Sequence, residues 1–389
     1  MNRSCACCSN AALLNLWELP KLPLTGIYVD NLQTPDFEYH HEQNLLYCED
    51  CSHIQLSKIV NPDLLYLETY SHRTSQSPIS KSGNEFLLSY IRSRKFQKKA
   101  QILEIGCNDV YLLENLQNAS LYRAGIDPIF APEAKQLAPG FKVKGGFAET
   151  VDYSELIEKP VDLIISAHTF EHIVDPIKSL LNLKPYLGQD VDFVIEVPSS
   201  LRMFEQLRLD QVFSQHINYY SPKSLSRLMG NLDLYLVDIS YNYSYWGGTQ
   251  ILHFSNHYDK GTSHSEINGI SLDQIRYSIK HFSDEIESLK FKIRNAPGRV
   301  FAYGAAQMLP ILQYHIGDEF NSIIEIFDDN VERIGRYFPF LDRQIRGFEG
   351  FEFRPSDMVI ITALDSCKPL VKNLLDKGIK LITIPIGNI

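Results

Sequence analysis

The cysteines near the start of the chain are the first residues whose spacing could do chemistry. Cys5 and Cys8 form one Cys-x-x-Cys pair, and Cys48 and Cys51 form a second. Each pair can turn two thiolates toward one ion, and four sulfurs complete the tetrahedral shell of a structural Zn²⁺ site. Cys7 leaves one sulfur spare. Free thiols in a reduced protein are the alternative, but five of the seven cysteines stand here, which favours zinc.

A second candidate site is the stretch 101–113, where an apolar run that contains Glu104 is broken by Gly106. A strand, a glycine turn and a helix form the opening unit of a nucleotide-binding α/β domain. Asn108 stands where a pyrophosphate-binding turn would have a further glycine. The pattern therefore favours a ligand with a positive or hydroxyl-bearing end, and S-adenosylmethionine is such a ligand.

An acidic residue follows the next apolar run. Asp127 and Pro128 stand about 20 positions after the glycine turn, where an acid is placed to bind the hydroxyls of a ribose. A single aspartate at a strand end is common by itself. Its separation from Glu104 and Gly106 makes it a candidate for the same cofactor site.

The segment 204–222 holds the candidate catalytic base. His216 stands close to Tyr219 and Tyr220, and an unperturbed imidazole pKa near 6.5 suits proton abstraction at neutral pH. A structural histidine that anchors the loop is the alternative. Tyr70 and His72 flank the start of a polar loop that could reach a cleft, although such loops are usually solvated connections.

These residues require two sheets to position them. Apolar runs alternate with helical patterns in the middle of the chain and again near its end, which predicts two parallel α/β sheets, the second one smaller. Between them, apolar residues recur at spacings of three and four over 275–293, which predicts one amphipathic helix. The apolar runs lie at 102–105, 121–126, 161–166, 191–198, 300–306, 323–329, 358–362 and 380–384.

The length of 389 residues is enough for two or three domains. We predict a zinc-binding domain over 1–75, a central α/β domain that holds the first glycine turn over 76–258, and a linker helix with a second Rossmann-like domain over 259–389. The formal net charge of −10 argues against binding to nucleic acid or an anionic membrane through bulk charge. No stretch approaches the roughly 18 apolar residues of a membrane helix, and the N-terminus has no apolar signal region, so we expect the protein in the cytoplasm. We also expect it to be a monomer.

Three motifs carry a resemblance to a known family. Residues 104–109, 125–128 and 170–176 resemble the successive motifs of class I S-adenosylmethionine-dependent methyltransferases. With the cysteine pairs before them, nearly the whole chain resembles the sugar C-methyltransferases that act on nucleotide-linked deoxysugars. The resemblance implies a zinc-binding N-terminal part, a central methyltransferase domain and a C-terminal Rossmann-like domain.

The resemblance also implies roles for particular residues. Glu104, Gly106, Asn108 and Asp127 would bind the cofactor, with His168 and Thr169 lining its adenine side; helix capping and packing are the alternative roles of a histidine there. Tyr219 and Tyr220 would contact the substrate. The second Rossmann-like domain would hold the sugar nucleotide, unless it is only a scaffold. Its matching residues are Tyr303, Gly304, Asp328 and Asn330.

The catalytic motif departs from the family. The family has Tyr-x-Glu-His, in which the histidine removes a proton beside a keto group, whereas this chain has Phe213, Ser214, Gln215 and His216. A glutamate orients the base and stabilises its cation, and a tyrosine can donate to an enolate oxygen. Gln215 carries no charge and Phe213 cannot donate a hydrogen bond, although Tyr70, His72 or the tyrosines after His216 could take over these roles.

The departures leave three functions open. The first is a C-methyltransferase for a nucleotide-activated sugar with His216 as base. The second is an O- or N-methyltransferase for a sugar or another small molecule, because a hydroxyl or amine needs only one base and good alignment. The third is a non-catalytic binding protein that keeps the fold.

Overall fold

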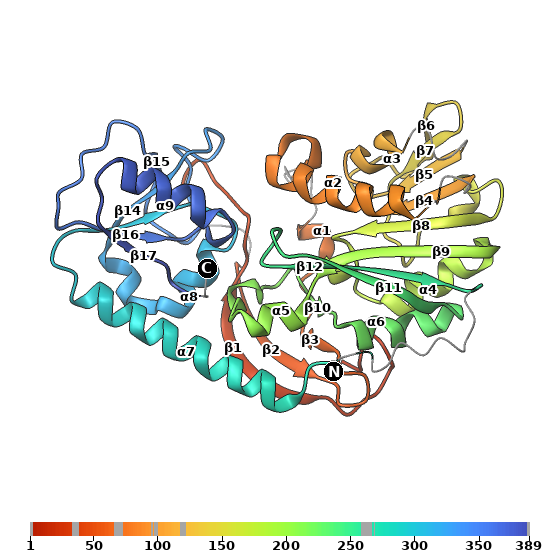
Figure 1. Cartoon of the computed structure of the whole chain (residues 1–389), viewed down its shortest axis with the longest axis horizontal. Helices are drawn as coiled ribbons and strands as arrows, with labels where there is room; N and C mark the ends of the chain where they lie inside the picture. Colours follow the sequence, from red (N-terminus) through yellow and green to blue (C-terminus); the bar gives the residue numbers. More distant parts are fainter. Residues whose placement is uncertain are drawn as a thin grey trace. The chain divides into compact units, whose positions relative to one another are not determined.

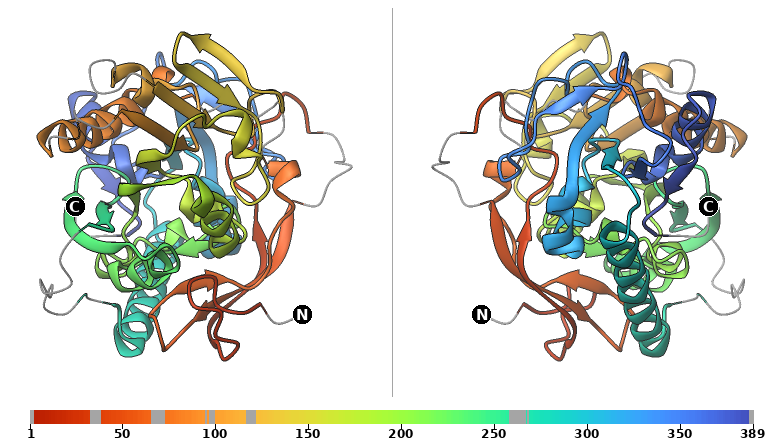
Figure 2. Two further views of the ribbon diagram at one scale, coloured as in Figure 1. Left: turned by 90° about the vertical axis from the view of Figure 1, so that its right-hand side faces the viewer. Right: turned by 90° about the vertical axis from the view of Figure 1, so that its left-hand side faces the viewer.

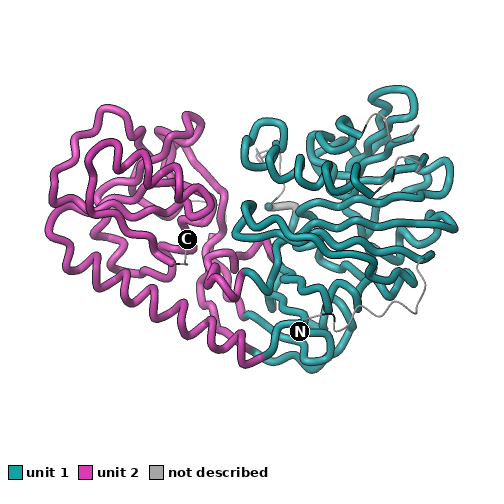
Figure 3. Tube along the Cα trace, in the orientation of Figure 1, with its two compact units in different colours: residues 1–15, 45–202, 217–271 teal, residues 16–44, 203–216, 272–389 magenta. Residues whose placement is uncertain are grey.

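The structure is a computed structural model, and it describes residues 3–32, 39–65, 73–94, 96, 100–116, 122–257, 267 and 269–386. These residues group into two compact units (Figure 3). The first comprises Met1–Asn15, Leu45–Arg202 and Ile217–Ser271, and the second comprises Leu16–Asn44, Met203–His216 and Leu272–Ile389. The three domain boundaries expected above follow the chain, whereas these units group segments by contact, so those boundaries stay a prediction.

The first unit is built on an eight-stranded sheet (Figure 1). Its strands lie in the order β11-β12-β9-β8-β4-β5-β7-β6. They are β4 (Gln101–Ile105), β5 (Tyr122–Ile126), β6 (Lys135–Ala138), β7 (Phe141–Lys144), β8 (Val161–Ala167), β9 (Leu187–Pro198), β11 (Tyr235–Asn242) and β12 (Thr249–Ser255). The predicted apolar runs therefore form the interior strands, because strands covered on both faces are apolar throughout.

The strand directions define the fold. β7, β5, β4, β8 and β9 pair in parallel, and β12 is antiparallel to both β9 and β11. β6 adds an antiparallel edge beside β7. Because the carboxyl ends of β4, β5, β8 and β9 lie at one edge, residues that follow these strands are brought together there.

Helices cover both faces of this sheet. Leu163 and Ile165 of β8 pack in the core that contains α2 (Pro78–Ser93) and α3 (Tyr111–Asn115). Ile164, between them, packs with α4 (Pro176–Leu183) and α6 (Pro222–Met229) on the opposite face. The alternation follows from the two-residue period of a strand.

A small sheet links the cysteine pairs to this domain. Its order is β1-β2-β3-β10, comprising β1 (Leu14–Pro23), β2 (His40–Tyr47), β3 (Ile54–Leu56) and β10 (Asn218–Tyr219). β3 pairs with β10, so a strand that follows the second cysteine pair is joined to the end of the methyltransferase segment. The sequence patterns did not predict this sheet. A short helix, α1 (Pro62–Leu65), follows this sheet's third strand in the sequence.

The second unit contains a five-stranded parallel sheet of the predicted Rossmann-like kind, which Figure 2 shows from a second direction. Its order is β15-β14-β13-β16-β17, with β13 (Val300–Tyr303), β14 (Ile323–Asp328), β15 (Ile345–Gly347), β16 (Met358–Ile361) and β17 (Leu381–Thr383). The predicted amphipathic helix is α7 (Leu272–Arg294), and it packs on α8 (Leu309–Ile316). Two further helices are α5 (Ser200–Glu205), within which the boundary between the two units falls, and α9 (Cys367–Asp376) of the second unit.

A helix that spans a membrane must be both long and apolar, and the described helices differ from this. None of them combines the length and apolarity that crossing a bilayer requires.

Candidate cofactor and metal sites

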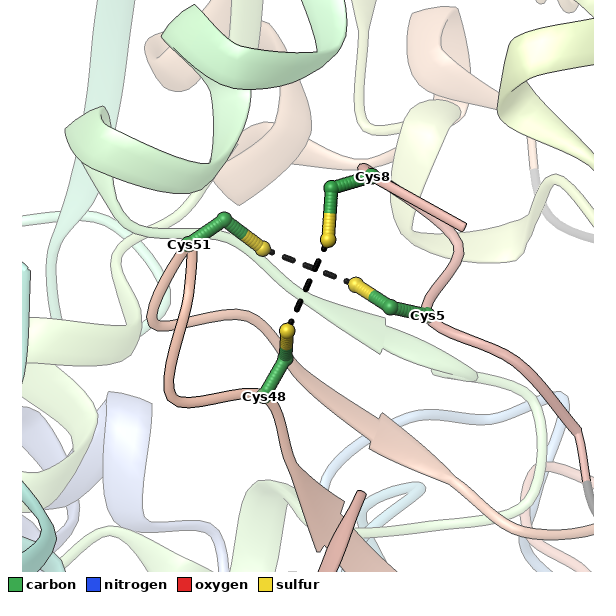
Figure 4. A group of neighbouring side chains, drawn as sticks. All are labelled: Cys5, Cys8, Cys48 and Cys51. Carbon is green, nitrogen blue, oxygen red and sulfur yellow. Dashed lines mark hydrogen bonds between the residues drawn. The ribbon is translucent and has the colours of Figure 1, made fainter. Parts of the chain in front are cut away.

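The four predicted cysteine ligands come together in the first unit. Figure 4 shows the sulfurs of Cys5, Cys8, Cys48 and Cys51 pointing toward one another, and all four lie within 4.8 Å of each other. The distances are 3.5 Å between Cys5 and Cys51 and 3.6 Å between Cys8 and Cys48. A tetrahedral ion with Zn–S bonds of about 2.3 Å places its sulfurs about 3.8 Å apart. The donor set and its dimensions therefore fit a structural zinc ion.

Cys7 is not part of this group. Its thiol is buried, and burial raises its pKa well above the ordinary value. Within the group, the hydrogen bond from Cys51 lowers the pKa of the Cys5 thiol, and the thiolate is the form that binds metal. The spare sulfur of the sequence pattern is therefore Cys7.

Polar contacts fix the first cysteine pair to β3. The Ala6 amide donates to Oε1 of Gln55 (2.8 Å), and Nε2 of Gln55 donates to the Ser4 carbonyl (3.1 Å). Arg3 donates to the carbonyls of Leu56 (3.1 Å) and Val174 (2.9 Å). The knuckle is thus anchored to the same domain that holds the glycine turn.

The predicted cofactor residues meet at the carboxyl ends of β4 and β5. Gly106 has φ 78°, and a Cβ there would lie 1.9 Å from Oγ1 of Thr169, so only glycine fits. The carboxylate of Asp127, followed by Pro128, accepts from the Asn108 amide (2.9 Å) and caps the turn. The structure therefore brings the first glycine turn, Asp127 and Thr169 together.

Glu104 is the unsatisfied member of this group. Its side chain is buried, and its Oε2 has no hydrogen-bond partner among the described residues. Burial raises the pKa of Glu104 well above the ordinary value, and the charges of Asp127 and Asp109 add to the effect. Burial also raises the pKa of Asp127. A buried acid without a partner costs free energy, so its retention indicates a ligand that supplies hydroxyl groups.

The loop before α2 reaches the same turn. The Thr74 amide donates to Oδ1 of Asn108 (3.3 Å), and the Ser75 amide donates to Oδ2 of Asp109 (2.8 Å). These contacts agree with the expectation that the polar loop approaches a site. Tyr70 and His72, to which a catalytic role was assigned, lie outside the described residues.

The second glycine turn has a different character. Gly304 has φ 111°, and Asp328 accepts from the Asn330 amide (2.7 Å) and from Arg333 (3.3 Å). Tyr303 is fully buried; its hydroxyl donates to Asp329 (2.5 Å) and accepts from the Asn373 side chain (2.7 Å). The carboxylate of Asp328 and the hydroxyl of Tyr303 therefore already have hydrogen-bond partners within the second unit.

The structure accounts for the departures in the candidate catalytic motif. In the second unit, Nε2 of Gln215 donates to the Thr25 carbonyl (2.8 Å), and its Oε1 accepts from the Thr25 hydroxyl (3.2 Å). An amide can do both, whereas an ionised glutamate could only accept hydrogen bonds. The buried ring of Phe213 lies 4.1 Å from that of His216, which is itself buried.

The two tyrosines after His216 belong to the first unit. Tyr219 is buried in β10, and the hydroxyl of the fully buried Tyr220 donates to the Phe170 carbonyl (3.2 Å). Burial raises the pKa of Tyr220 well above the ordinary value. Their predicted role in substrate binding stays a prediction.

The sequence patterns missed the buried acids beside this edge. Glu171 follows β8, and Glu196 lies inside the apolar run of β9, where it accepts from the Thr249 hydroxyl (2.7 Å). A charged residue inside an apolar strand is a recognisable signal, because burying a charge is costly unless it is used.

Comparison with known proteins agrees with this geometry. Residues 79–239 match the family model "Methyltransferase domain", and residues 5–66 match the model "Putative zinc binding domain". The chain is also 22% identical over 242 residues to "C-methyltransferase NovU" from Streptomyces niveus. That match covers 60% of this chain and 56% of the relative, so the chain spans about half the length of the curated relative it matches.

Two solved structures illustrate the more distant similarity. Magnesium protoporphyrin IX methyltransferase from Synechocystis PCC 6803, with bound SAH, is 8% identical with a TM-score of 0.35, over 46% of this chain and 84% of its own. N-methyltransferase NodS from Bradyrhizobium japonicum is 14% identical with a TM-score of 0.34, over 47% and 89%. It is the family models that identify residues 79–239 as a methyltransferase domain and residues 5–66 as a zinc-binding domain.

Proposed function

We propose that the chain methylates a nucleotide-activated deoxysugar, at a carbon beside a keto group. The observation that supports a bound S-adenosylmethionine is the unsatisfied buried carboxyl group of Glu104 at the first glycine turn, next to Asp127. The choice of acceptor rests on the similarity to a C-methyltransferase and on the second Rossmann-like sheet.

The residues of the first unit would hold the cofactor as follows. Glu104 and Asp127 bind hydroxyl groups, and the turn at Gly106 admits the ligand close to the backbone because no side chain projects there. The four-cysteine centre stabilises the N-terminal segment and takes no part in the reaction. S-adenosylmethionine supplies an electrophilic methyl group.

In this proposal His216 takes the proton from the acceptor carbon. A neutral imidazole is a suitable base near neutral pH. The carboxylate that assists it in the family is replaced by Gln215, whose amide is bonded to Thr25. In the second unit, the sugar nucleotide would lie at the carboxyl ends of β13 and β14, near Gly304 and Asp328.

Methylation of oxygen or nitrogen is the second candidate. It is favoured by one observation: neither Phe213 nor Gln215 can help to stabilise an enolate. A hydroxyl or amine already carries its nucleophilic electron pair, so it needs only alignment and removal of one proton.

Mass spectrometry of a panel of nucleotide-linked deoxysugars tests the proposal. The protein is incubated with each sugar and S-adenosylmethionine, and we expect one member to gain a methyl group whose position NMR then assigns to carbon. A methyl group on oxygen or nitrogen would select the second candidate. No methylated product, together with no heat on titration with S-adenosylmethionine, would contradict both.

The His216→Ala variant tests the base. We expect turnover to fall by about 10²–10⁴-fold, the usual contribution of a general base, with the affinity for S-adenosylmethionine unchanged. A fully active variant would exclude His216 as the base while leaving the methyltransferase activity in place.

A further inference from the structure

A half-buried histidine beside a buried carboxylate follows β8 in the first unit. Nδ1 of His168 lies 3.3 Å from Oε1 of Glu171, and the Glu171 side chain is only 2% exposed. His168 has φ 48°, a left-handed conformation that a residue other than glycine adopts at a cost. The rings of Tyr245 and Trp246 pack against the imidazole, at 5.0 and 6.4 Å between centroids. Strained backbone and ring packing together hold the imidazole in one place.

The outer atoms of this pair have no hydrogen-bond partner within the described ranges. Nε2 of His168 and both carboxylate oxygens of Glu171 are buried and form no hydrogen bond among the described residues. One of those oxygens nevertheless lies within ion-pair distance of Nδ1 of His168. Leaving a buried polar atom unbonded costs about 1–3 kcal/mol. Such an atom in a rigid setting indicates that a ligand completes it.

The charges around His168 favour the imidazolium form. The titratable groups that face it are Glu171, Glu196 and Tyr245. Burial acts against the positive charge, but the Glu171 and Glu196 carboxylates outweigh it and raise the pKa of His168. In the imidazolium both ring nitrogens donate. Nδ1 then faces Glu171, and Nε2 is a donor that the described residues leave without an acceptor.

The pair lies beside the cofactor turn. Thr169, the next residue, is the one that a Cβ on Gly106 would strike. The His168 amide donates to the carbonyl of Glu196 (2.9 Å), near the carboxyl end of β9. His168 is therefore fixed at the edge of the sheet where ligands of open α/β sheets bind.

We propose that His168, held by Glu171, is a catalytic hydrogen-bond donor for the keto oxygen of the acceptor. The inference rests on the proposed C-methylation. The base removes a proton from the carbon beside the keto group, and the electron pair of that carbon–hydrogen bond forms an enolate whose oxygen accepts from Nε2 of His168. The enolate carbon then bonds to the methyl group while the methyl–sulfur bond breaks with its electron pair on sulfur, and the keto group is restored. His168 thereby supplies a hydrogen-bond donor to the enolate oxygen, and Glu171 is its positioning residue.

Deuterium exchange at the acceptor carbon tests this role without methyl transfer. Each nucleotide-linked keto-deoxysugar of the panel is incubated with protein and S-adenosylhomocysteine in D₂O, and NMR follows loss of the proton beside the keto group. We expect His168→Asn, which tolerates the left-handed backbone, to slow exchange by about 10²–10³-fold, as loss of one oxyanion donor does. Exchange at the wild-type rate would overturn the proposal.

His253 offers a matched control. It is a buried histidine within β12 of the same unit, with Nε2 2.7 Å from the Asp192 carboxylate, and neither residue follows the carboxyl end of a strand. We expect His253→Asn to leave the exchange rate unchanged. An equal slowing by both variants would indicate general destabilisation and overturn the specific role of His168.

The pH dependence separates a donor from a base. A donor must be protonated, so exchange assisted by His168 falls as the pH rises through its pKa. In Glu171→Gln the pKa of His168 is lower, and this alkaline limb moves to lower pH; His168→Asn removes the limb. A limb in which the rate falls with falling pH, assigned to His168, would overturn the donor role.

NMR of ¹⁵N-labelled histidine tests the charge of His168 without an acceptor. We expect the ring to stay doubly protonated above its ordinary pKa of about 6.5 and to lose this property in Glu171→Gln. A neutral ring at pH 6 would overturn the inference alone. Failure of the proposed function itself is recognised separately, by the absence of S-adenosylmethionine binding in wild type.

Discussion

The glycine turns at Gly106 and Gly304 share a backbone arrangement but differ in how their polar groups are hydrogen-bonded. Each follows a strand that pairs in parallel with its neighbour, and each glycine has a positive φ. An aspartate stands at the carboxyl end of the neighbouring strand in both cases: Asp127 directly follows β5, and Asp328 ends β14. At the first turn, Glu104 keeps an unbonded buried oxygen. At the second, Asp328 accepts from Asn330 and Arg333, and the Tyr303 hydroxyl both donates and accepts.

This difference indicates which of the two turns has buried polar atoms that a ligand could bond. The first turn and the nearby end of β8 leave buried atoms of Glu104, Asp109, His168 and Glu171 without hydrogen bonds. In the described part of the second unit, such atoms belong to His41, Ser214 and His315, and none of these follows a strand of the five-stranded sheet. The first turn therefore leaves buried oxygen and nitrogen atoms for a polar ligand, whereas the carboxylate of Asp328 and the hydroxyl of Tyr303 at the second are already hydrogen-bonded.

Removal of the metal should destabilise the first unit and leave the second unchanged, which we expect to be the largest difference between them. We expect Cys48→Ser, or chelation, to destabilise the segment 3–15 and β3 by several kcal/mol, because structural zinc supplies folding free energy of order 10 kcal/mol in small domains. Hydrogen exchange should rise there and stay unchanged in β13 and β16. Cys7→Ala should keep one zinc per chain; equal zinc loss in both variants would contradict the assigned ligand set.

Replacing each of the two glycines by alanine should give the next largest difference between the turns. Gly106→Ala places a Cβ against Thr169, and Gly304→Ala places one 2.4 Å from Cβ of Ala363. Both have positive φ, so each variant should lose about 1–3 kcal/mol of stability. Only Gly106→Ala should also lose affinity for S-adenosylmethionine in calorimetric titration. Loss of affinity in Gly304→Ala alone would reverse the roles of the two turns.

The two acids offer a finer comparison. A hydrogen bond to a charged group contributes about 1.5–3 kcal/mol, so Glu104→Ala should weaken S-adenosylmethionine binding roughly 10- to 150-fold. Asp328→Ala should leave that affinity close to wild type, because its partners are Asn330 and Arg333 of the second unit. Similar affinities in the two variants would remove the distinction.

The pH dependence of stability should show the smallest effect. Burial raises the pKa of Glu104 in the folded state. The unfolded chain then loses this proton first as the pH rises above about 4.3, so the raised pKa lowers the free energy of unfolding as pH rises toward the folded value. In Glu104→Gln this contribution is absent, and denaturant titrations should show a flatter decline. An identical slope in both proteins would contradict a buried, unsatisfied Glu104.

Much of the fold could be predicted from sequence because its signals are local. Buried parallel strands are continuous apolar runs, and the apolar spacing of three and four over 275–293 predicted α7. The cysteine spacing predicted a group that the structure brings together. The small sheet of β1, β2, β3 and β10 was missed because its strands lie far apart in sequence and β10 has only two residues.

The candidate site was less predictable because its key property is not local. Whether a buried acid is satisfied depends on partners elsewhere in the chain: the Asp127 carboxylate is bonded to the Asn108 amide, whereas Glu104 is left unsatisfied. The replacement of glutamate by Gln215 is explained by Thr25, 190 positions away. Spacing alone could not distinguish such partners.

Hydrogen exchange with and without S-adenosylmethionine tests the central claim most directly. We predict that saturation with the cofactor protects the amides around Gly106, Asn108 and Asp127 and leaves those around Gly304 and Asp328 unchanged. Protection confined to the second turn, or no protection at either turn, would contradict the assignment of the cofactor to the first.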